Sequence, residues 1–75
     1  MLEYKNHITI EPGIRSGKPC IKGTRITVYD VLSYLASGMR YEEILSDFPQ
    51  LTMDNIYACL AYSADEAKKH YVVAA

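Results

Sequence analysis

The apolar residues change their spacing at Thr27, and this change restricts the possible folds more than any other feature of the chain. After Thr27 they recur every three or four positions, the spacing of a helix with one buried face. The residues of this face are Val28, Val31, Leu32, Leu35 and Ala36. Thr27, with Asp30 three residues later, predicts a capped start, and Gly38 predicts the end of the helix.

Two further helices are expected in the C-terminal part. A short one is predicted from about Glu42 to Phe48, before Pro49, and its apolar stripe is Tyr41, Ile44, Leu45 and Phe48. A longer one follows Thr52, a good N-cap, and its apolar face comprises Met53, Ile56, Tyr57, Leu60, Ala61, Ala64 and Tyr71. Because a short connection joins them, the pair has the geometry of a helix-turn-helix unit.

The first third of the chain lacks helical spacing. The segment from His7 to Glu11 alternates polar and apolar residues, as a half-buried strand does, and a Pro-Gly pair then predicts a turn. A second extended piece is expected from Cys20 to Lys22, because Pro19 precedes it and a glycine interrupts it afterwards. This part is therefore predicted to be a short hairpin or an extended arm.

These elements define a mainly α fold class: a three-helix domain that contains a helix-turn-helix-like unit and is preceded by a short N-terminal β hairpin or extended arm. One domain is expected over residues 1–75, with a β or extended basic arm over 1–26 and the three helices over 27–71. A chain this short buries only about 60% of the surface that its unfolded form exposes. We therefore expect a homo-oligomer, a dimer or higher, and the seven tyrosines suit its interfaces.

Charge is divided unevenly along the chain, although the formal net charge is only −1. Up to Arg25 there are five basic and two acidic residues, whereas three basic and seven acidic residues follow. The basic residues that could contact DNA are Arg15, Lys18, Lys22 and Arg25. Two interpretations stay open: these cations hold phosphate groups, or they pair with the acidic helices, with Arg25 bound to Asp30 or Glu43.

The start of the third helix offers a second set of DNA-binding candidates, Thr52, Asn55 and Tyr57. A recognition helix reads base edges with side chains near its start, and Asn55 could read adenine. Asp54 would lie near the phosphates and repel them. Plain packing of two amphipathic helices therefore stays open as the alternative to insertion into a major groove.

The sequence offers no nucleotide-binding or catalytic pattern. Gly13 and Gly17 are separated by three residues and Lys18 is followed by a proline, which does not fit a phosphate-binding loop. His7 and His70 are isolated, and nothing places a nucleophile or an orienting carboxylate beside either. We therefore expect that the protein is not an enzyme.

Cofactors and membrane attachment are not indicated either. Cys20 and Cys59 have neither metal-ligand nor disulfide-framework spacing, so two reduced thiols, no metal and no cofactor are expected. The start of the chain is unlike a signal peptide, and no window approaches the about 20 apolar residues of a membrane span. These features predict a soluble, cytoplasmic protein with no membrane partner.

The run "GKPCIKGTRITVYDVLSYLASGMRYEEILSDFPQLTMDNIYACLAYSADEA" is more specific than any of its parts. Its characteristic positions are Gly17-Lys18-Pro19, Ile21, Gly23-Thr24-Arg25-Ile26, Val28, Leu35, Gly38, Glu43-Ile44-Leu45, Phe48-Pro49, Leu51-Thr52, Ile56 and Ala58 to Tyr62. In this order they resemble the small prokaryotic family called domain of unknown function 433, described as VapB-like antitoxins with a helix-turn-helix-like fold. The likeness extends from about Ile8 to Ala67.

This resemblance implies a dimer-forming antitoxin of a toxin-antitoxin system that restrains a partner with a PIN-like ribonuclease fold. It also implies binding to operator DNA and transcription regulation by autorepression. Cys20 and Tyr41 depart from the family pattern, which usually has a small apolar residue and a Ser or Thr cap there. Only Val72 to Ala75 follow the last helix, so toxin contacts are expected from the folded body or the N-terminal arm. The alternative is a dimeric protein-interaction module with no nucleic-acid role.

Overall fold

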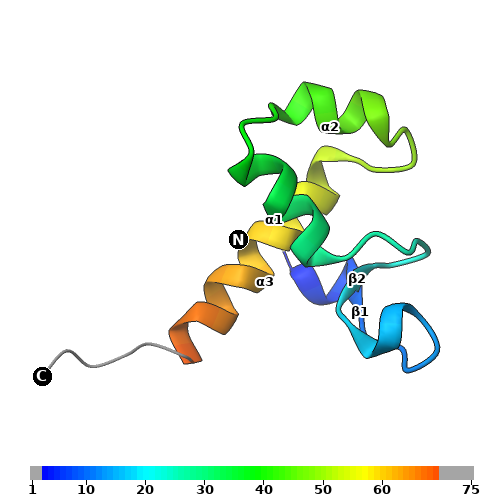
Figure 1. Ribbon diagram of the computed structural model, residues 1–75. Helices are drawn as coiled ribbons and strands as arrows, with labels where there is room; N and C mark the ends of the chain where they lie inside the picture. Colours follow the sequence, from blue (N-terminus) through cyan, green and yellow to red (C-terminus); the bar gives the residue numbers. More distant parts are fainter. Residues whose placement is uncertain (1–2, 70–75) are drawn as a thin grey trace, which may run out of the picture.

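The computed structural model describes residues 3–69, and its elements follow the order expected from the sequence (Figure 1). The α-helices are α1 (Val28–Ala36), α2 (Tyr41–Asp47) and α3 (Met53–Lys69). The strands are β1 (Ile8–Thr9) and β2 (Cys20–Ile21), and two 3-10 turns span Tyr4–Asn6 and Arg15–Gly17. The mainly α fold class with its N-terminal hairpin is confirmed. Positions 70 and 71, where the third helix was expected to end, lie outside the described residues.

The N-terminal segment forms a hairpin and not a free arm. Its strands pair antiparallel, with Ile8 opposite Ile21 and Thr9 opposite Cys20. Ile8 and Ile21 are buried because the face of the hairpin that they share packs into the core, and Cys20, on the other face, is buried beside Thr27. The strands are shorter than the alternation predicts, since Ile10 lies outside β1 and is 60% exposed.

Helix α1 has both the start and the end that its sequence predicts. The Thr27 hydroxyl accepts from the Asp30 amide at 2.9 Å, and the Asp30 carboxylate accepts from the Thr27 amide at 3.1 Å, which forms a capping box. After the helix, the Gly38 amide donates to the Leu35 carbonyl at 3.0 Å, and the next amide donates to the Tyr34 carbonyl at 3.1 Å. These two bonds form a Schellman motif, in which Gly38 adopts a φ of +99°.

Helices α2 and α3 are the expected short and long helices. Helix α2 begins at Tyr41, and the Glu43 carboxylate accepts from the Arg40 amide at 2.8 Å, which compensates for the missing Ser or Thr cap. Helix α3 follows Thr52, whose hydroxyl accepts from the Asn55 amide at 3.2 Å. Figure 1 shows that the second half of α3 extends beyond the other helices.

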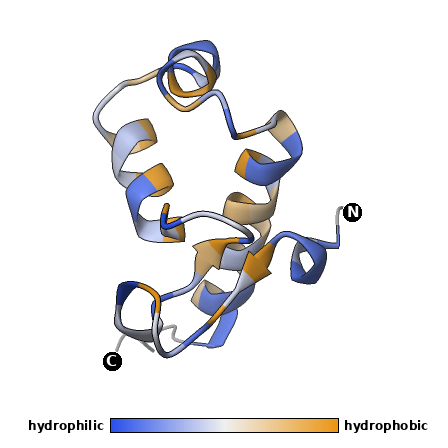
Figure 2. Cartoon of the chain, turned by 90° about the vertical axis from the view of Figure 1, so that its right-hand side faces the viewer, coloured by the Kyte–Doolittle hydropathy of each residue, from blue (hydrophilic) through white to orange (hydrophobic). Residues whose placement is uncertain are grey.

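The core lies where the hairpin meets the helices. Its largest fully buried side chains are Ile21, Ile44, Ile56, Val31, Thr27 and Cys59. Both strands carry hydrophobic residues in Figure 2. Further along α3, the Tyr62 and Tyr4 rings meet edge to face at a centroid distance of 5.6 Å, and the Tyr4 hydroxyl donates to Asp65. The first 3-10 turn therefore covers part of the extended half of α3.

Candidate nucleic-acid interface

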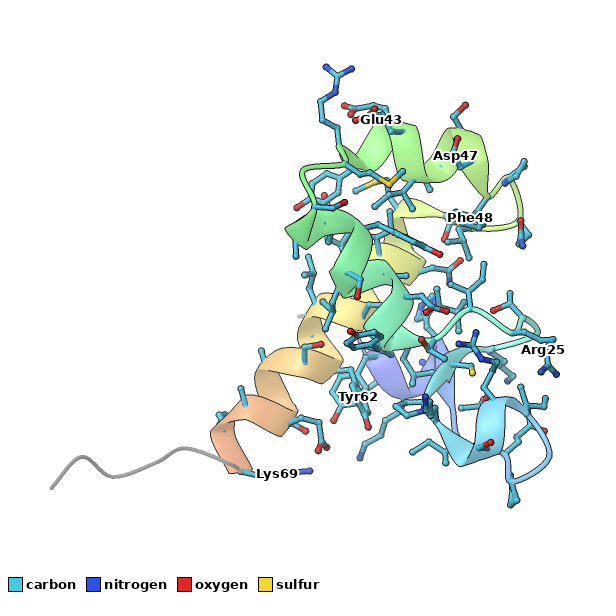
Figure 3. All side chains as sticks on the ribbon, viewed as in Figure 1. Arg25, Glu43, Asp47, Phe48, Tyr62 and Lys69 are labelled. Atoms are coloured by element: carbon cyan, nitrogen blue, oxygen red, sulfur yellow. The ribbon has the colours of Figure 1, made fainter. Side chains whose placement is uncertain are left out.

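Two loops carry the basic residues that the sequence singled out. Residues 10–19 connect β1 to β2, and residues 22–27 connect β2 to α1. Nη1 of Arg15 donates to the Arg25 carbonyl oxygen at 2.7 Å, which holds the two loops side by side. Figure 3 shows the Arg25 side chain on this hairpin side, pointing away from the helices. The fold thus gathers Arg15, Lys18, Lys22 and Arg25 on two adjacent loops.

Arg15 is engaged within the molecule. Its Nη1 lies 3.0 Å from Oδ2 of Asp30, and the two side chains are 35% and 23% exposed. Asp30 belongs to the capping box of α1, so Arg15 ties the first loop to the start of that helix. The pairing of Arg25 with Asp30 or Glu43 was wrong, because Arg15 pairs with Asp30 and Arg40 lies 3.6 Å from Glu43.

The backbone at Arg15 adopts an unusual conformation. The φ angles of Arg15, Ser16 and Gly17 are +49°, +58° and +77°. A left-handed conformation costs about 1–2 kcal/mol for a residue other than glycine, so two such residues in succession need contacts that hold them there. The two hydrogen bonds of Arg15 provide such contacts. This conformation could not be predicted at Arg15 and Ser16, since neither is a residue type that favours it.

The environment of Asp30, the partner of Arg15, favours the ionised form of its carboxyl group. Partial burial acts to raise the pKa of its carboxyl group, but the Thr27 amide, the Arg15 guanidinium and the Thr27 hydroxyl together lower the pKa below its ordinary value. The first turn of α1 adds the positive end of the helix dipole. Asp30 is therefore ionised at neutral pH and forms a true ion pair with Arg15.

The other three basic residues remain available to a ligand. Lys18, Lys22 and Arg25 are exposed, and none of them forms an ion pair with any residue between 3 and 69. Their positive charges are therefore not neutralised by the described part of the acidic helices.

The loop that carries Lys22 and Arg25 has a fixed backbone. The Thr24 hydroxyl donates to the Ile21 carbonyl at 2.8 Å and accepts from the Ile26 amide at 3.0 Å. Gly23, with a φ of +80°, permits the tight turn. Because this backbone is already ordered, a ligand that binds the two cations immobilises only their side chains.

The second set of candidates, at the start of α3, divides into two kinds. The Asn55 Oδ1 atom accepts from the Thr52 amide at 2.9 Å, and its Nδ2 atom lies 3.2 Å from Nδ1 of His7. Asn55 therefore caps α3 and joins it to the hairpin. Thr52 and Tyr57 are exposed, but so is Asp54 between them. Sequence reasoning missed the role of His7, because its partner lies 48 positions away along the chain.

The charge along the chain is also separated in space. Helix α2 carries exposed carboxylates at Glu42, Glu43 and Asp47. Figure 3 places Glu43 and Asp47 at the end of the molecule remote from Lys69 and apart from Arg25. An open hollow of about 600 Å³ is lined by Leu35, Met39, Arg40, Tyr41, Glu42 and Leu60. One side of the molecule is thus basic, and another is acidic and partly apolar.

The described residues offer no metal centre. Between residues 3 and 69, no group of three or more His, Cys, Asp and Glu side chains is arranged to hold a metal ion. Cys20 and Cys59 are buried free thiols, and burial raises the pKa of Cys59 to about 12. None of the helices in this part of the chain is long and apolar enough to span a membrane.

Together these features define a class of small α domain with three helices, in which α3 packs on an N-terminal hairpin and joins α2 in a helix-turn-helix-like pair. Residues 8–63 match the family model described as "Protein of unknown function (DUF433)", which covers more than half of the chain. The protein belongs to this family, as the sequence resemblance indicated.

A curated protein and a solved structure resemble the chain. The chain is 36% identical over 56 residues to the uncharacterized protein y4eO of Sinorhizobium fredii (strain NBRC 101917 / NGR234), and the match covers 75% of the chain. It spans only 25% of that relative's length. The crystal structure of a DUF433 member from Anabaena variabilis ATCC 29413 has a TM-score of 0.80 and 31% identity, covering 87% of this chain and 64% of that one.

Proposed function

We propose that the protein is a VapB-like antitoxin that binds operator DNA as a dimer, represses its own synthesis and restrains a PIN-like ribonuclease toxin. The observation that carries the DNA-binding role is the set of exposed cations Lys18, Lys22 and Arg25 on two adjacent loops. The resemblance of the chain to VapB-like antitoxins supports the toxin partner. In this proposal the protein acts in the cytoplasm by binding alone and catalyses no reaction.

The proposed DNA contacts differ in kind. Lys18 and Lys22 hold phosphate groups as point charges, whereas the planar guanidinium of Arg25 suits two parallel hydrogen bonds to phosphate or guanine. Arg15 contributes indirectly, because it holds the backbone of Arg25 in place. Thr52 and Tyr57 can add contacts from α3, while Asn55 keeps the helix start fixed against the hairpin.

The first test compares binding of the purified protein to its own upstream DNA and to a scrambled duplex, at low and near-physiological salt. We expect a preference for the native fragment that persists at the higher salt. Lys22→Ala should weaken binding to both duplexes and reduce the slope of log K against log salt by about one, because one phosphate contact is lost.

A matched control removes the same charge elsewhere. Lys69 lies at the far end of α3 from the basic loops (Figure 3). Lys69→Ala should therefore leave the slope of log K against log salt unchanged. Equal slopes for wild type and Lys22→Ala would exclude Lys22 from the interface. Equal affinity for both duplexes at the higher salt would contradict operator recognition.

The second candidate function is a protein-interaction module with no nucleic-acid role. The open hollow beside α2 and the exposed carboxylates of this helix favour it, because they offer an apolar surface with an acidic rim. The test adds the purified protein to a PIN-like ribonuclease encoded beside it and measures RNA cleavage. Stoichiometric inhibition of RNA cleavage without DNA binding would favour the protein-interaction module. Inhibition of RNA cleavage together with operator binding would support the VapB-like antitoxin.

A further inference from the structure

The outer face of α3 carries a largely exposed stripe, which α2 and the first 3-10 turn border and only partly cover. Its residues follow one another at alternating steps of three and four, the heptad spacing of helices that pair along their length. They are Asp54, Tyr57, Ala61, Ala64 and Lys68. All are exposed except Ala61, which is half-buried, whereas the buried residues of α3 lie on the other side of the helix.

Two open hollows lie along this stripe. Leu60 and Tyr41 line the hollow of about 600 Å³ beside α2. Ala61, Ala64 and Lys68 line a second hollow of about 330 Å³ next to the first 3-10 turn, so the second half of the stripe forms one wall of this hollow. Tyr41 and Tyr57 are 39% and 48% exposed, and their rings meet edge to face at a centroid distance of 6.5 Å. Open hollows along an exposed helix face leave room for the side chains of another helix to pack.

The order of charges along the stripe indicates what that helix is. The stripe begins with an acidic residue, Asp54, and ends with a basic one, Lys68, about 21 Å further along the helix axis. We propose that a second copy of the chain packs its α3 antiparallel on this face, in a two-fold symmetric dimer centred near Ala61. Each Asp54 then faces Lys68 of the partner subunit, whereas parallel packing would place like charges together.

The apolar centre of the stripe fits the same geometry. The small side chains of Ala61 and Ala64 let two helices approach closely near the two-fold axis, and each Tyr57 covers the region of the partner's Ala64. The antiparallel helices also oppose their dipoles favourably. This inference names the face used by the dimer of the proposed function and rests on that proposal only for the existence of a dimer.

A charge-swap experiment tests the pairing. Asp54→Lys and Lys68→Asp, each alone, should raise the dimer dissociation constant about tenfold, because two attractions per dimer become two repulsions. The double variant Asp54→Lys/Lys68→Asp should restore the constant to near that of the wild type. Sedimentation velocity of the full chain measures the constant, and circular dichroism checks that each variant is folded. Recovery requires contact between subunits, since the two positions lie too far apart on one helix to interact.

A cross-linking experiment tests the position of the axis independently. Ala61→Cys should form a disulfide-linked dimer under mild oxidation, because the two copies of position 61 meet near the axis. Ala67→Cys, also exposed on α3 but outside the stripe, serves as the matched control and should cross-link much more slowly. The wild-type thiols, both buried, give the background.

The outcomes separate this inference from the proposed function. A dimer that is unaffected by the charge swaps, that fails to recover in the double variant, or that cross-links equally at both positions overturns the α3 interface alone. A protein that sediments as a monomer at every soluble concentration overturns the interface and the dimeric part of the proposed function together. The Lys22→Ala salt slope is measured separately and tests only the DNA contact.

Discussion

Removal of the Arg15 side chain should destabilise the protein even when no DNA is present. Arg15 donates to the Arg25 carbonyl at 2.7 Å and to Asp30 at 3.0 Å, so Arg15→Ala deletes two hydrogen bonds, one of them within an ion pair. Arg25→Ala is the matched control. It deletes an exposed guanidinium but keeps the backbone carbonyl that Arg15 binds.

The size of the effect follows from the exposure of the pair. Because the two side chains are 35% and 23% exposed, solvent screens the ion pair, and we assign it about 0.5–1 kcal/mol of unfolding free energy. The bond to the Arg25 carbonyl adds about 1 kcal/mol. In a domain of this size, each kcal/mol corresponds to roughly 4–8 °C, so the melting temperature should fall by about 6–16 °C.

Urea unfolding followed by circular dichroism gives the comparison directly. A double-mutant cycle of Arg15→Ala with Asp30→Asn, which keeps an oxygen acceptor for the Thr27 amide, should show a coupling of about 0.5–1 kcal/mol. The pKa of Asp30 is lowered in the folded protein, so this stabilisation is present above the ordinary value of 3.8 and is lost as the pH falls through the folded value. Two outcomes would refute the assignment of this role to Arg15: additive changes in the free energy of unfolding in the cycle, or a loss of stability in Arg25→Ala equal to that in Arg15→Ala.

Three further predictions concern stability. Gly38→Ala should lower the free energy of unfolding by about 1 kcal/mol, because the φ of Gly38 is +99° and, apart from its chain neighbours, no atom lies within 4 Å of the added methyl group. An unchanged midpoint in urea would contradict the Schellman assignment. Ile44→Ala, at a fully buried position, should cost about 2–5 kcal/mol, and a loss below 1 kcal/mol by the same assay would remove Ile44 from the core. The hydrogen bond to Asp65 raises the pKa of Tyr4 from 10.0 to about 12. The stability that this bond contributes is therefore fully present below pH 10 and is lost as the pH rises through 12. Wild-type stability should therefore fall more steeply than that of Tyr4→Phe over this range, and parallel pH profiles would contradict the bond.

Periodicity and capping residues predicted most of the fold. The stripe after Thr27 placed α1, and both of its ends match, because Thr27 and Asp30 form a local capping box and Gly38 supplies a left-handed residue. The start of α3 after Thr52 was predicted for the same reason. These signals depend on residues at most a few positions apart, so a single sequence contains them in full.

Contacts between distant segments could not be predicted in the same way. The positive charge of Arg15 is visible in the sequence, but its partner is decided by a left-handed backbone at two non-glycine residues. The pairing of Asn55 with His7 depends on how the hairpin packs on α3. The basic residues of the candidate interface could therefore be named from the sequence, whereas the division between structural Arg15 and exposed Lys18, Lys22 and Arg25 required the three-dimensional arrangement.

The proposed dimer and the proposed DNA surface constrain each other. The Lys22 amide donates to the His7 carbonyl at 2.8 Å, and the His7 ring contacts Asn55 in the first turn of α3, so the basic loops adjoin the N-terminal end of this helix. Antiparallel pairing of α3 places those ends on opposite sides of the two-fold axis, at least about 21 Å apart. Half-sites one turn apart on DNA are spaced by roughly 34 Å, which is of the same order. A dimer built in this way would recognise an inverted repeat, because its two basic surfaces are related by the same two-fold axis.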